Sequence, residues 1–211
     1  MPEVVAIIGA GPLGRWLALA AARAGFRVQL EDVMPANLHH AQELLRQQLG
    51  PQPLAETPLA LKGHGFSRAA NAAISDSALA PEATLPVAFV STIEEAVRNA
   101  DLVIDCVPDE LESKLEILLL LDRMAPPRTV LATPTTRHSI ADLASCTYRA
   151  DRCVAIEAEA SSLTEGASRT ILLRTTSRTS VETVALLTRF WSRLGFTASF
   201  APDAAEAGAD R

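Results

Sequence analysis

The sequence has little of what marks several classes of protein. Only three cysteines occur in 211 residues, Cys106, Cys146 and Cys153, and their odd number and wide spacing favour neither a disulfide framework nor a metal site. The longest apolar stretches stop well short of the length that spans a bilayer, and no basic segment followed by an apolar one opens the chain. These absences predict a globular, cytoplasmic protein with no membrane partner.

Basic residues are also few. The chain has 19 Lys and Arg against 25 Asp and Glu, which gives a formal net charge of −6, and no run is rich in Lys or Arg. This balance disfavours a nucleic acid or an anionic membrane as partner. His39 and His40 are adjacent on a predicted helix, where neighbouring side chains diverge by about 100°. They are therefore expected to be exposed polar residues, and we predict no metal.

The first thirty-odd residues carry the clearest motif. Val4 to Ile8 form an apolar strand pattern that runs into the G-x-G-x-x-G spacing of Gly9, Gly11 and Gly14, and a second strand pattern ends at Asp32. In a dinucleotide-binding fold the first glycine permits a tight turn, the second lets the backbone approach a pyrophosphate, and the third lets the helix pack on the sheet. The N-terminus of that helix then faces the phosphates.

Asp32 sets the expected cofactor. It follows the glycines by about 20 residues, as the dinucleotide motif requires. There it can accept hydrogen bonds from the adenosine ribose hydroxyls, and its charge repels the extra phosphate of NADP. The sequence therefore predicts NAD, held by the three glycines, by Pro12 and Leu13 between them, and by Asp32. Glu31 alternates to the opposite face of the strand, where we expect a solvated strand end.

The remaining chain alternates strand and helix patterns. This alternation predicts an α/β fold of the Rossmann type, with a doubly wound, mostly parallel sheet over residues 1–203 and an acidic tail at 204–211 that frays. Residues 50–86 lack periodicity and predict an irregular excursion with one short helix at 67–74. The predicted strands are 4–8, 28–31, 87–90, 102–107, 129–133, 152–156, 170–174 and 196–200. The predicted helices are one that Gly25 ends, 35–49, a capping box at 91–94 opening a helix to 99, 110–124, 139–144 capped by Ser139, and a capping box at 179–182 opening a helix to 194.

A family resemblance rests on three segments: Val5–Gly14, Ala100–Asp105, and Val107–Lys114 with the sequence V-P-D-E-L-E-S-K. Together they resemble the NAD-binding N-terminal domain of the 3-hydroxyacyl-CoA dehydrogenases, from Val4 to about Asp203. The resemblance implies hydride exchange between NAD and the 3-hydroxy carbon of an acyl-CoA.

The resemblance also implies further cofactor contacts. Val107 and Pro108 would line the nicotinamide side of the cleft, and Lys114 with Glu110 would reach the nicotinamide ribose. Their place after a strand agrees with the rule that ligands bind at carboxyl ends. An equally weighted alternative makes Lys114 a solvated helix lysine that pairs with Glu110 four residues earlier.

The chain departs from the family where catalysis is expected. The family's Ser-Asn-Thr-Ser-Ser loop is matched by residues 133–137, Thr-Pro-Thr-Thr-Arg, which keeps a hydroxyl at Thr136. Glu157 stands where the family has its catalytic histidine, and a carboxylate with an ordinary pKa is a poor acid and base at pH 7. Burial, or repulsion from Glu159, would raise that pKa. His138 is the nearest histidine to the cleft, and its alternative is a loop or cap residue because no orienting partner can be named.

Three hypotheses follow for function. The first is an NAD-dependent oxidoreductase of the hydroxyacyl-CoA type, in which Thr136, Glu157 and His138 replace the usual catalytic set. The second is a module that binds or senses NAD(H) without turnover, because the family's helical C-terminal domain would begin where this chain stops, at Arg211. The third is a subunit completed by a separately encoded helical partner. We also expect homodimerisation through apolar surface.

Overall fold

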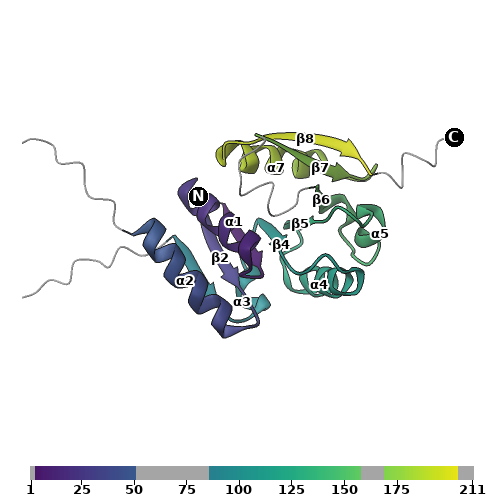
Figure 1. Cartoon of the computed structure of the whole chain (residues 1–211). Coiled ribbons are helices and arrows are strands. Elements are labelled where there is room, and N and C mark those ends of the chain that lie inside the picture. Colours follow the sequence, from purple (N-terminus) through teal and green to yellow (C-terminus); the bar gives the residue numbers. More distant parts are fainter. Residues whose placement is uncertain (1–2, 51–85, 158–168, 204–211) are drawn as a thin grey trace, which may run out of the picture.

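An eight-stranded sheet forms the centre of the computed structural model, which describes residues 3–50, 86–157 and 169–203 (Figure 1). The strand order is β3-β2-β1-β4-β5-β6-β7-β8, and every neighbouring pair is parallel except the antiparallel pair β6–β7. This confirms the predicted Rossmann-type, mostly parallel sheet. The strands are β1 Val4–Ile8, β2 Arg27–Glu31, β3 Val87–Val90, β4 Leu102–Asp105, β5 Val130–Pro134, β6 Cys153–Glu157, β7 Thr170–Thr175 and β8 Thr197–Pro202.

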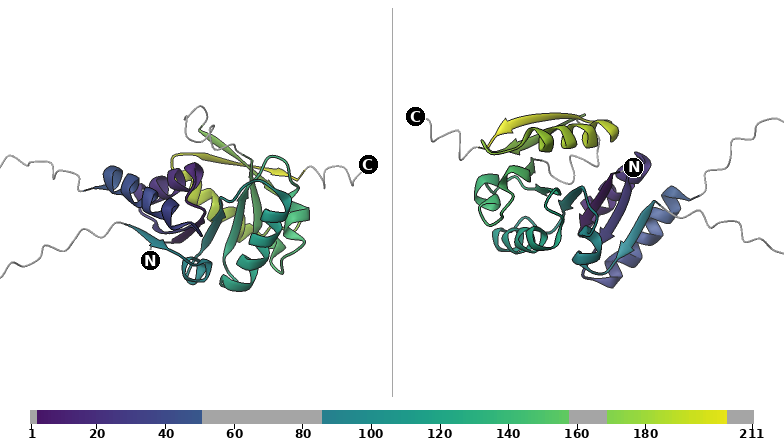
Figure 2. Two further views of the ribbon diagram at one scale, coloured as in Figure 1. Left: turned by 60° about the horizontal axis from the view of Figure 1, so that its bottom comes forward. Right: turned by 180° about the vertical axis from the view of Figure 1, so that it is seen from behind.

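Helices cover both faces of the sheet, so its central strands are buried on both sides (Figures 1 and 2). On one face α1, α2 and α7 pack into a buried cluster that includes Leu17 and Trp191. On the other face α3, α4 and α5 pack into a second cluster that includes Val97 and Leu118. The helices are α1 Pro12–Arg23, α2 Pro35–Leu49, α3 Ile93–Val97, α4 Leu111–Met124, α5 Ile140–Ala144 and α7 Val181–Arg193, with a 3₁₀ turn at Ala150–Arg152.

The helix starts agree with the predicted caps to within one residue. The Ser139 side chain caps α5 by accepting from the Asp142 N–H at 3.2 Å, as predicted. The two predicted capping boxes begin one residue later than expected, because Thr92 caps α3 and Ser180 caps α7. At α3 the pattern does not select, because Glu95 follows Thr92 as Glu94 follows Ser91, whereas Ser180 caps α7 with Thr183 instead of a glutamate three residues later. The predicted excursion and its helix at 67–74, and the tail at 204–211, lie outside the described residues.

The sheet reverses its strand order at β1. The chain leaves β1 toward β2 and β3 on one side and returns to β4 on the other side. In such a sheet the ligand crevice lies outside the carboxyl ends of the strands at this reversal. Gly9, Asp32 and Val107 follow β1, β2 and β4, so the predicted cofactor residues converge on one edge.

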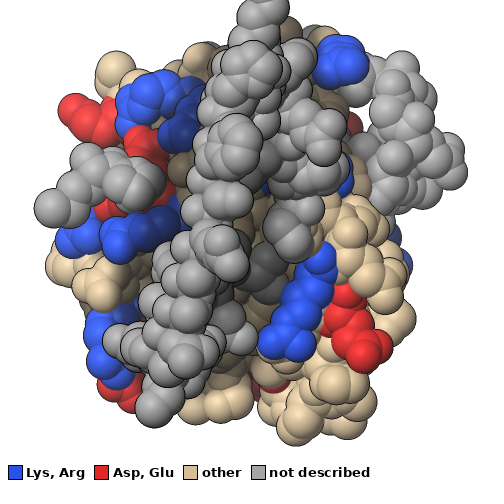
Figure 3. Space-filling model, turned by 90° about the vertical axis from the view of Figure 1, so that its left-hand side faces the viewer, with Lys and Arg blue, Asp and Glu red and all other residues tan. Residues whose placement is uncertain are grey.

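Charged side chains of both signs are intermingled on the face of the molecule drawn in Figure 3. Ion pairs on the surface of the molecule include Arg98 with Glu94 at 3.9 Å and Arg128 with Asp101 at 3.2 Å. Such exposed pairs contribute little to stability. Within the described ranges, no helix combines the length and apolar character that crossing a membrane requires.

Candidate functional site

The turn between β1 and α1 has the backbone geometry that its glycines predict. Gly9 has φ +103°, a region that side chains other than hydrogen rarely allow, and its N–H donates to the Glu31 carbonyl at 2.8 Å. A Cβ on Gly14 would lie 1.9 Å from the Gly9 carbonyl oxygen. The first and third glycines therefore make the tight turn and the close packing of α1 that the sequence predicts.

Gly11 differs from the other two glycines because the space beside it is open. A Cβ placed on Gly11 would meet no atom within 4 Å. Gly11 is the N-cap of α1, no side chain caps this helix, and Pro12 occupies its first turn. The uncapped N–H groups and the helix dipole favour an anion at this place. The residues present thus fit a pyrophosphate beside Gly11.

Asp32 is held rigidly at the end of β2. Its Oδ2 accepts from the Ala10 N–H at 2.8 Å and its Oδ1 accepts from the Met34 N–H at 2.8 Å. The Asn37 amide donates to both oxygens at 3.2 Å. Because these bonds fix the carboxylate beside the glycine turn, its remaining acceptor capacity faces the crevice as an anion that a ribose diol can bind.

A cavity of about 550 Å³ opens along this edge, within the range of small-molecule sites. It brings together most of the predicted cofactor residues. Leu13 instead packs against the core, and neither Glu110 nor Lys114 lines the cavity. The lining residues are Ile8, Gly9, Gly11, Pro12, Glu31, Asp32, Val33, Met34, Asn37, Ile93, Cys106, Val107, Pro108 and Ile117.

The prediction that Glu31 is a solvated strand end is wrong. Its side chain is only 4% exposed and lines the cavity. Burial, and secondarily the negative charge of Asp32, raises the pKa of the Glu31 carboxyl to about 7. The prediction failed because α3, which lies far from Glu31 in the sequence, packs against β2.

Lys114 is buried and pairs with Asp105. The alternative that made it a solvated helix lysine paired with Glu110 is therefore wrong. The Lys114 side chain is fully buried, and Nζ lies 3.2 Å from Asp105 Oδ2. Thr133 donates to the same oxygen at 2.8 Å, and the Val107 N–H donates to Oδ1 at 2.9 Å. Burial raises the pKa of Asp105 even though Lys114 opposes the shift. This network fixes the loop that carries Val107 to the end of β4.

A second cavity of about 280 Å³ lies at the carboxyl ends of β5 and β6 and contains the predicted catalytic residues. Thr136, His138 and Glu157 all line it. The Glu157 carboxylate forms an ion pair with the Arg174 guanidinium, which raises the pKa of Arg174. Glu159 lies outside the described residues.

His138 has a partner that the sequence analysis did not name. The His138 Nε2 atom lies 3.3 Å from the Asp109 carbonyl oxygen and 3.7 Å from Asp109 Oδ1. The backbone N–H of His138 donates to Thr135 Oγ1 at 3.1 Å. Asp109 directly follows Pro108, so one short loop borders the first cavity and positions a histidine in the second. The available signal was an acidic residue at the carboxyl end of a neighbouring strand.

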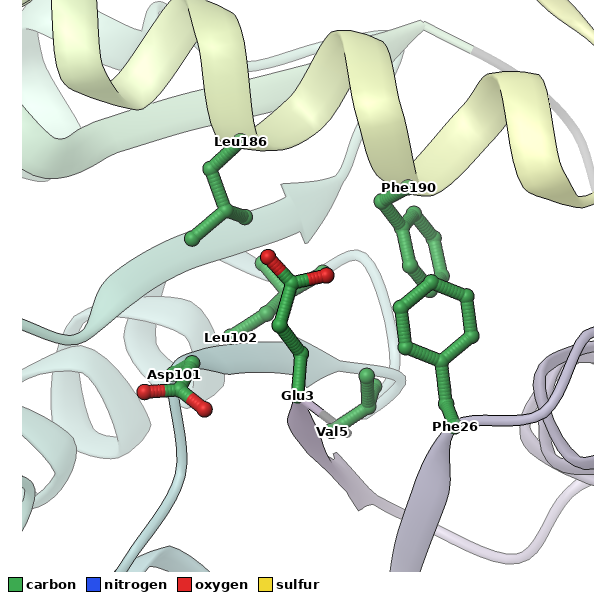
Figure 4. Close-up of a pocket in the computed structure, with 7 residues that line it drawn as sticks. All are labelled: Glu3, Val5, Phe26, Asp101, Leu102, Leu186 and Phe190. Carbon is green, nitrogen blue, oxygen red and sulfur yellow. The ribbon is translucent and has the colours of Figure 1, made fainter. Parts of the chain in front are cut away.

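A small cavity of about 10 Å³, room for about one water molecule, lies at the opposite, amino-terminal edge of the sheet (Figure 4). Leu186 and Phe190 of α7 border it together with Phe26 and Glu3, and the Glu3 carboxylate binds Arg189 at 3.0 Å. No group of three or more His, Cys, Asp or Glu side chains suited to a metal occurs among the residues with described positions.

The parallel sheet, the glycine turn, the uncapped α1 and the fixed carboxylate define a dinucleotide-binding domain of the Rossmann class. The chain belongs to the family of 3-hydroxyacyl-CoA dehydrogenase NAD-binding domains, whose family model matches residues 4–198.

Curated relatives share part of their length with this chain. It is 30% identical over 150 residues to the probable 3-hydroxybutyryl-CoA dehydrogenase of Bacillus subtilis strain 168, covering 71% of this chain and 46% of that protein. It is 30% identical over 152 residues to the mitochondrial hydroxyacyl-coenzyme A dehydrogenase of Sus scrofa, covering 70% and 43%. The chain thus spans less than half the length of these relatives.

Among solved structures, the (S)-3-hydroxybutyryl-CoA dehydrogenase of Ralstonia eutropha superposes with a TM-score of 0.73 at 20% identity, covering 97% of this chain and 65% of that one. The prephenate dehydrogenase of A. aeolicus, solved with NAD+, superposes with a TM-score of 0.63 at 15% identity, covering 96% and 60%. At these identities the likeness concerns the fold.

Proposed function

We propose that this chain binds NAD(H) and is the cofactor-binding part of an oxidoreductase that acts on a 3-hydroxyacyl-CoA or a related hydroxy acid. The observation that supports this most directly is the pair of cavities at one sheet edge, joined by the loop at Pro108 and Asp109. The first cavity has the features of a dinucleotide site. The second cavity is lined by His138, by the hydroxyl residue Thr136 and by the ion pair of Glu157 with Arg174.

In this proposal NAD supplies the hydride acceptor, and the protein supplies binding, orientation and proton transfer. The helix dipole and the N–H groups at Gly11 hold the pyrophosphate, while Asp32 accepts from the ribose. His138 takes the hydroxyl proton of the substrate during oxidation and returns it during reduction. Asp109 acts as a positioning residue that orients the imidazole ring.

Asp32 gives a prediction on cofactor choice. We expect NAD to bind at least about 100-fold more tightly than NADP, and the substitution Asp32→Asn to reduce that preference to about tenfold or less, because it removes the charge that repels the 2′-phosphate. Titration calorimetry with both cofactors measures the ratio. Asn keeps an acceptor oxygen for only one of the two N–H groups of Ala10 and Met34, so some stability is lost, and a cooperative urea transition would show that the variant still folds. An unchanged preference would contradict the role of the charge.

The activity prediction concerns His138. We expect the protein to oxidise NADH with acetoacetyl-CoA or a longer 3-oxoacyl-CoA, and His138→Gln to lower kcat about 100-fold or more, the usual worth of a general acid. The control is His39→Gln on α2, because the His39 side chain is 75% exposed and lines neither cavity. No NADH oxidation across short and long acyl chains, in a protein that binds NADH, would remove the oxidoreductase proposal.

A second candidate function is NAD(H) binding without turnover. The ion pair of Glu157 with Arg174 favours it, because the carboxylate that the resemblance puts in place of the family's catalytic histidine is engaged by a guanidinium. Calorimetric NADH binding together with no turnover of any 3-oxoacyl-CoA would support this candidate over the first.

A further inference from the structure

We propose that the Glu31 carboxyl group recognises the adenine ring of the cofactor by pairing with its 6-amino group and an adjacent ring nitrogen. This inference rests on the NAD binding proposed above and adds a residue that selects the base. Asp32, its neighbour, engages the ribose and carries no information about the base.

The register of the sheet places the Glu31 side chain. Glu31 lies beside Ile8 of β1 and Val90 of β3, and neighbours in register share one face of a sheet. Ile8 and Val90 belong to the cluster under α3 and α4, so Glu31 points to that face. There it shares the 550 Å³ cavity with Ile93 of α3 and Ile117 of α4. The carboxyl group therefore sits at one end of an apolar-walled recess.

The order of groups along NAD leads to the same recess. The pyrophosphate fits beside Gly11, and the adenosine ribose fits beside Asp32. The base would continue from the ribose within the same cavity, whose walls include Ile93 and Ile117. A flat, largely apolar ring suits these walls, and its polar edge then needs a partner.

Glu31 is a polar group without a partner in the described part of the chain. Its side chain is 4% exposed, and no donor from a described residue reaches its carboxyl group. A neutral carboxyl group offers one O–H donor and one carbonyl acceptor side by side. Adenine offers the complementary pair, an amino donor next to a ring-nitrogen acceptor. An ionised carboxylate only accepts, so it repels the lone pair of the ring nitrogen.

The surrounding charges favour the neutral form near pH 7. Burial and the charge of Asp32 raise the pKa of Glu31 to about 7. On α3 the charged residues are Glu94–Glu95, of which Glu94 is 73% exposed and pairs with Arg98. On α4 the Lys114 ammonium is committed to Asp105 of β4. No cation among these neighbours compensates a Glu31 carboxylate, so a bound adenine favours its protonated form.

The first test is the pH dependence of NAD affinity, measured by calorimetry from pH 6 to pH 8. At pH 6 Glu31 is mostly protonated and NAD binds with its full affinity. The Kd for NAD then rises as the pH passes through about 7. A single linked proton gives about a tenfold rise by pH 8. Glu31→Gln keeps a donor and an acceptor but cannot ionise, so its Kd stays within about twofold over this range. The control Glu94→Gln removes one exposed carboxylate and retains the wild-type profile.

The second test alters the base. In 1,N6-etheno-NAD the 6-amino group no longer donates, so the wild type binds it about tenfold more weakly than NAD at pH 6, the worth of about one hydrogen bond. Glu31→Leu narrows this ratio to about threefold or less, with the urea midpoint checking its fold. Two outcomes overturn the inference and leave the proposed function standing. One is tight NAD binding with the same pH profile in wild type and Glu31→Gln. The other is a ratio of etheno-NAD Kd to NAD Kd that is unchanged in Glu31→Leu. Absence of NAD binding at every pH overturns both the inference and the proposed function.

Discussion

Replacing Gly14 with alanine is expected to destabilise the protein by about 3 kcal/mol or more, the upper range for forcing an atom into a packed site. The added Cβ would lie 1.9 Å from the Gly9 carbonyl oxygen and 3.0 Å from the Gly9 carbonyl carbon. Both are backbone atoms, and Gly9 is held by its bond to the Glu31 carbonyl and by its own positive φ. Relief therefore requires α1 to move off the sheet. Urea unfolding at a fixed pH measures the loss.

Gly11→Ala is the matched control for Gly14→Ala. The same methyl group at Gly11 meets no atom within 4 Å, and the N-cap φ of −66° suits alanine. The free energy of unfolding from urea titration should fall by about 1 kcal/mol or less, the cost of placing alanine at an N-cap. NAD affinity should nevertheless fall by about tenfold or more, because the methyl group occupies the space where the pyrophosphate approaches. Similar stability losses in the two variants would contradict the different roles assigned to these glycines.

The contrast between these glycines was predictable because the motif encodes backbone conformation locally. Gly9, Gly11 and Gly14 act within six consecutive residues, and the strand, turn and helix that surround them are each evident in the sequence. The strand and helix sequence was predictable for the same reason, since periodicity and caps are local signals. The antiparallel pairing of β7 with β6 carries no such local signal, and only the general expectation of a mostly parallel sheet covered it.

The site residues that prediction missed depend on contacts between distant segments. The burial of Glu31 depends on α3 packing against β2, and strand alternation alone indicates only which face the side chain takes. The contact between Asp109 and His138 joins positions 29 residues apart at the ends of neighbouring strands. Resemblance to the family directed attention to Glu157, yet its partner Arg174 lies on the antiparallel strand β7. Such pairs follow from sheet order rather than from spacing.

The second prediction with a large expected effect concerns the buried pair of Lys114 and Asp105. Lys114→Met keeps most of the apolar stem but removes the ammonium 3.2 Å from Asp105 Oδ2. Breaking a buried pair from one side leaves an uncompensated charge and costs about 3–5 kcal/mol. Because Asp105 also accepts from Thr133 and the Val107 N–H, the loop that lines the large cavity should loosen too. We expect a lower urea midpoint together with weaker NAD binding.

The pH dependence of Lys114→Met distinguishes a lost charge partner from lost packing. Burial already raises the pKa of Asp105 in the folded protein, and removing Lys114 removes the charge that opposes this shift. A carboxyl group whose pKa is higher folded than unfolded binds its proton more tightly in the folded state, so stability falls as pH rises from the ordinary carboxyl range toward the raised pKa. Lys114→Met should therefore lose more stability relative to wild type at pH 8 than at pH 5.

The double variant Asp105→Asn with Lys114→Met completes this prediction. It removes both charges while the Asn amide oxygen still accepts from the Val107 N–H, and uncharged replacements of buried pairs are often neutral or stabilising. We therefore expect it to regain most of the stability lost in Lys114→Met and to show little additional pH dependence. A double variant as unstable as the single one, with equal losses at pH 5 and pH 8, would show that Lys114 acts through the packing of its stem. In that case the charge pair would not be what fixes the Val107 loop.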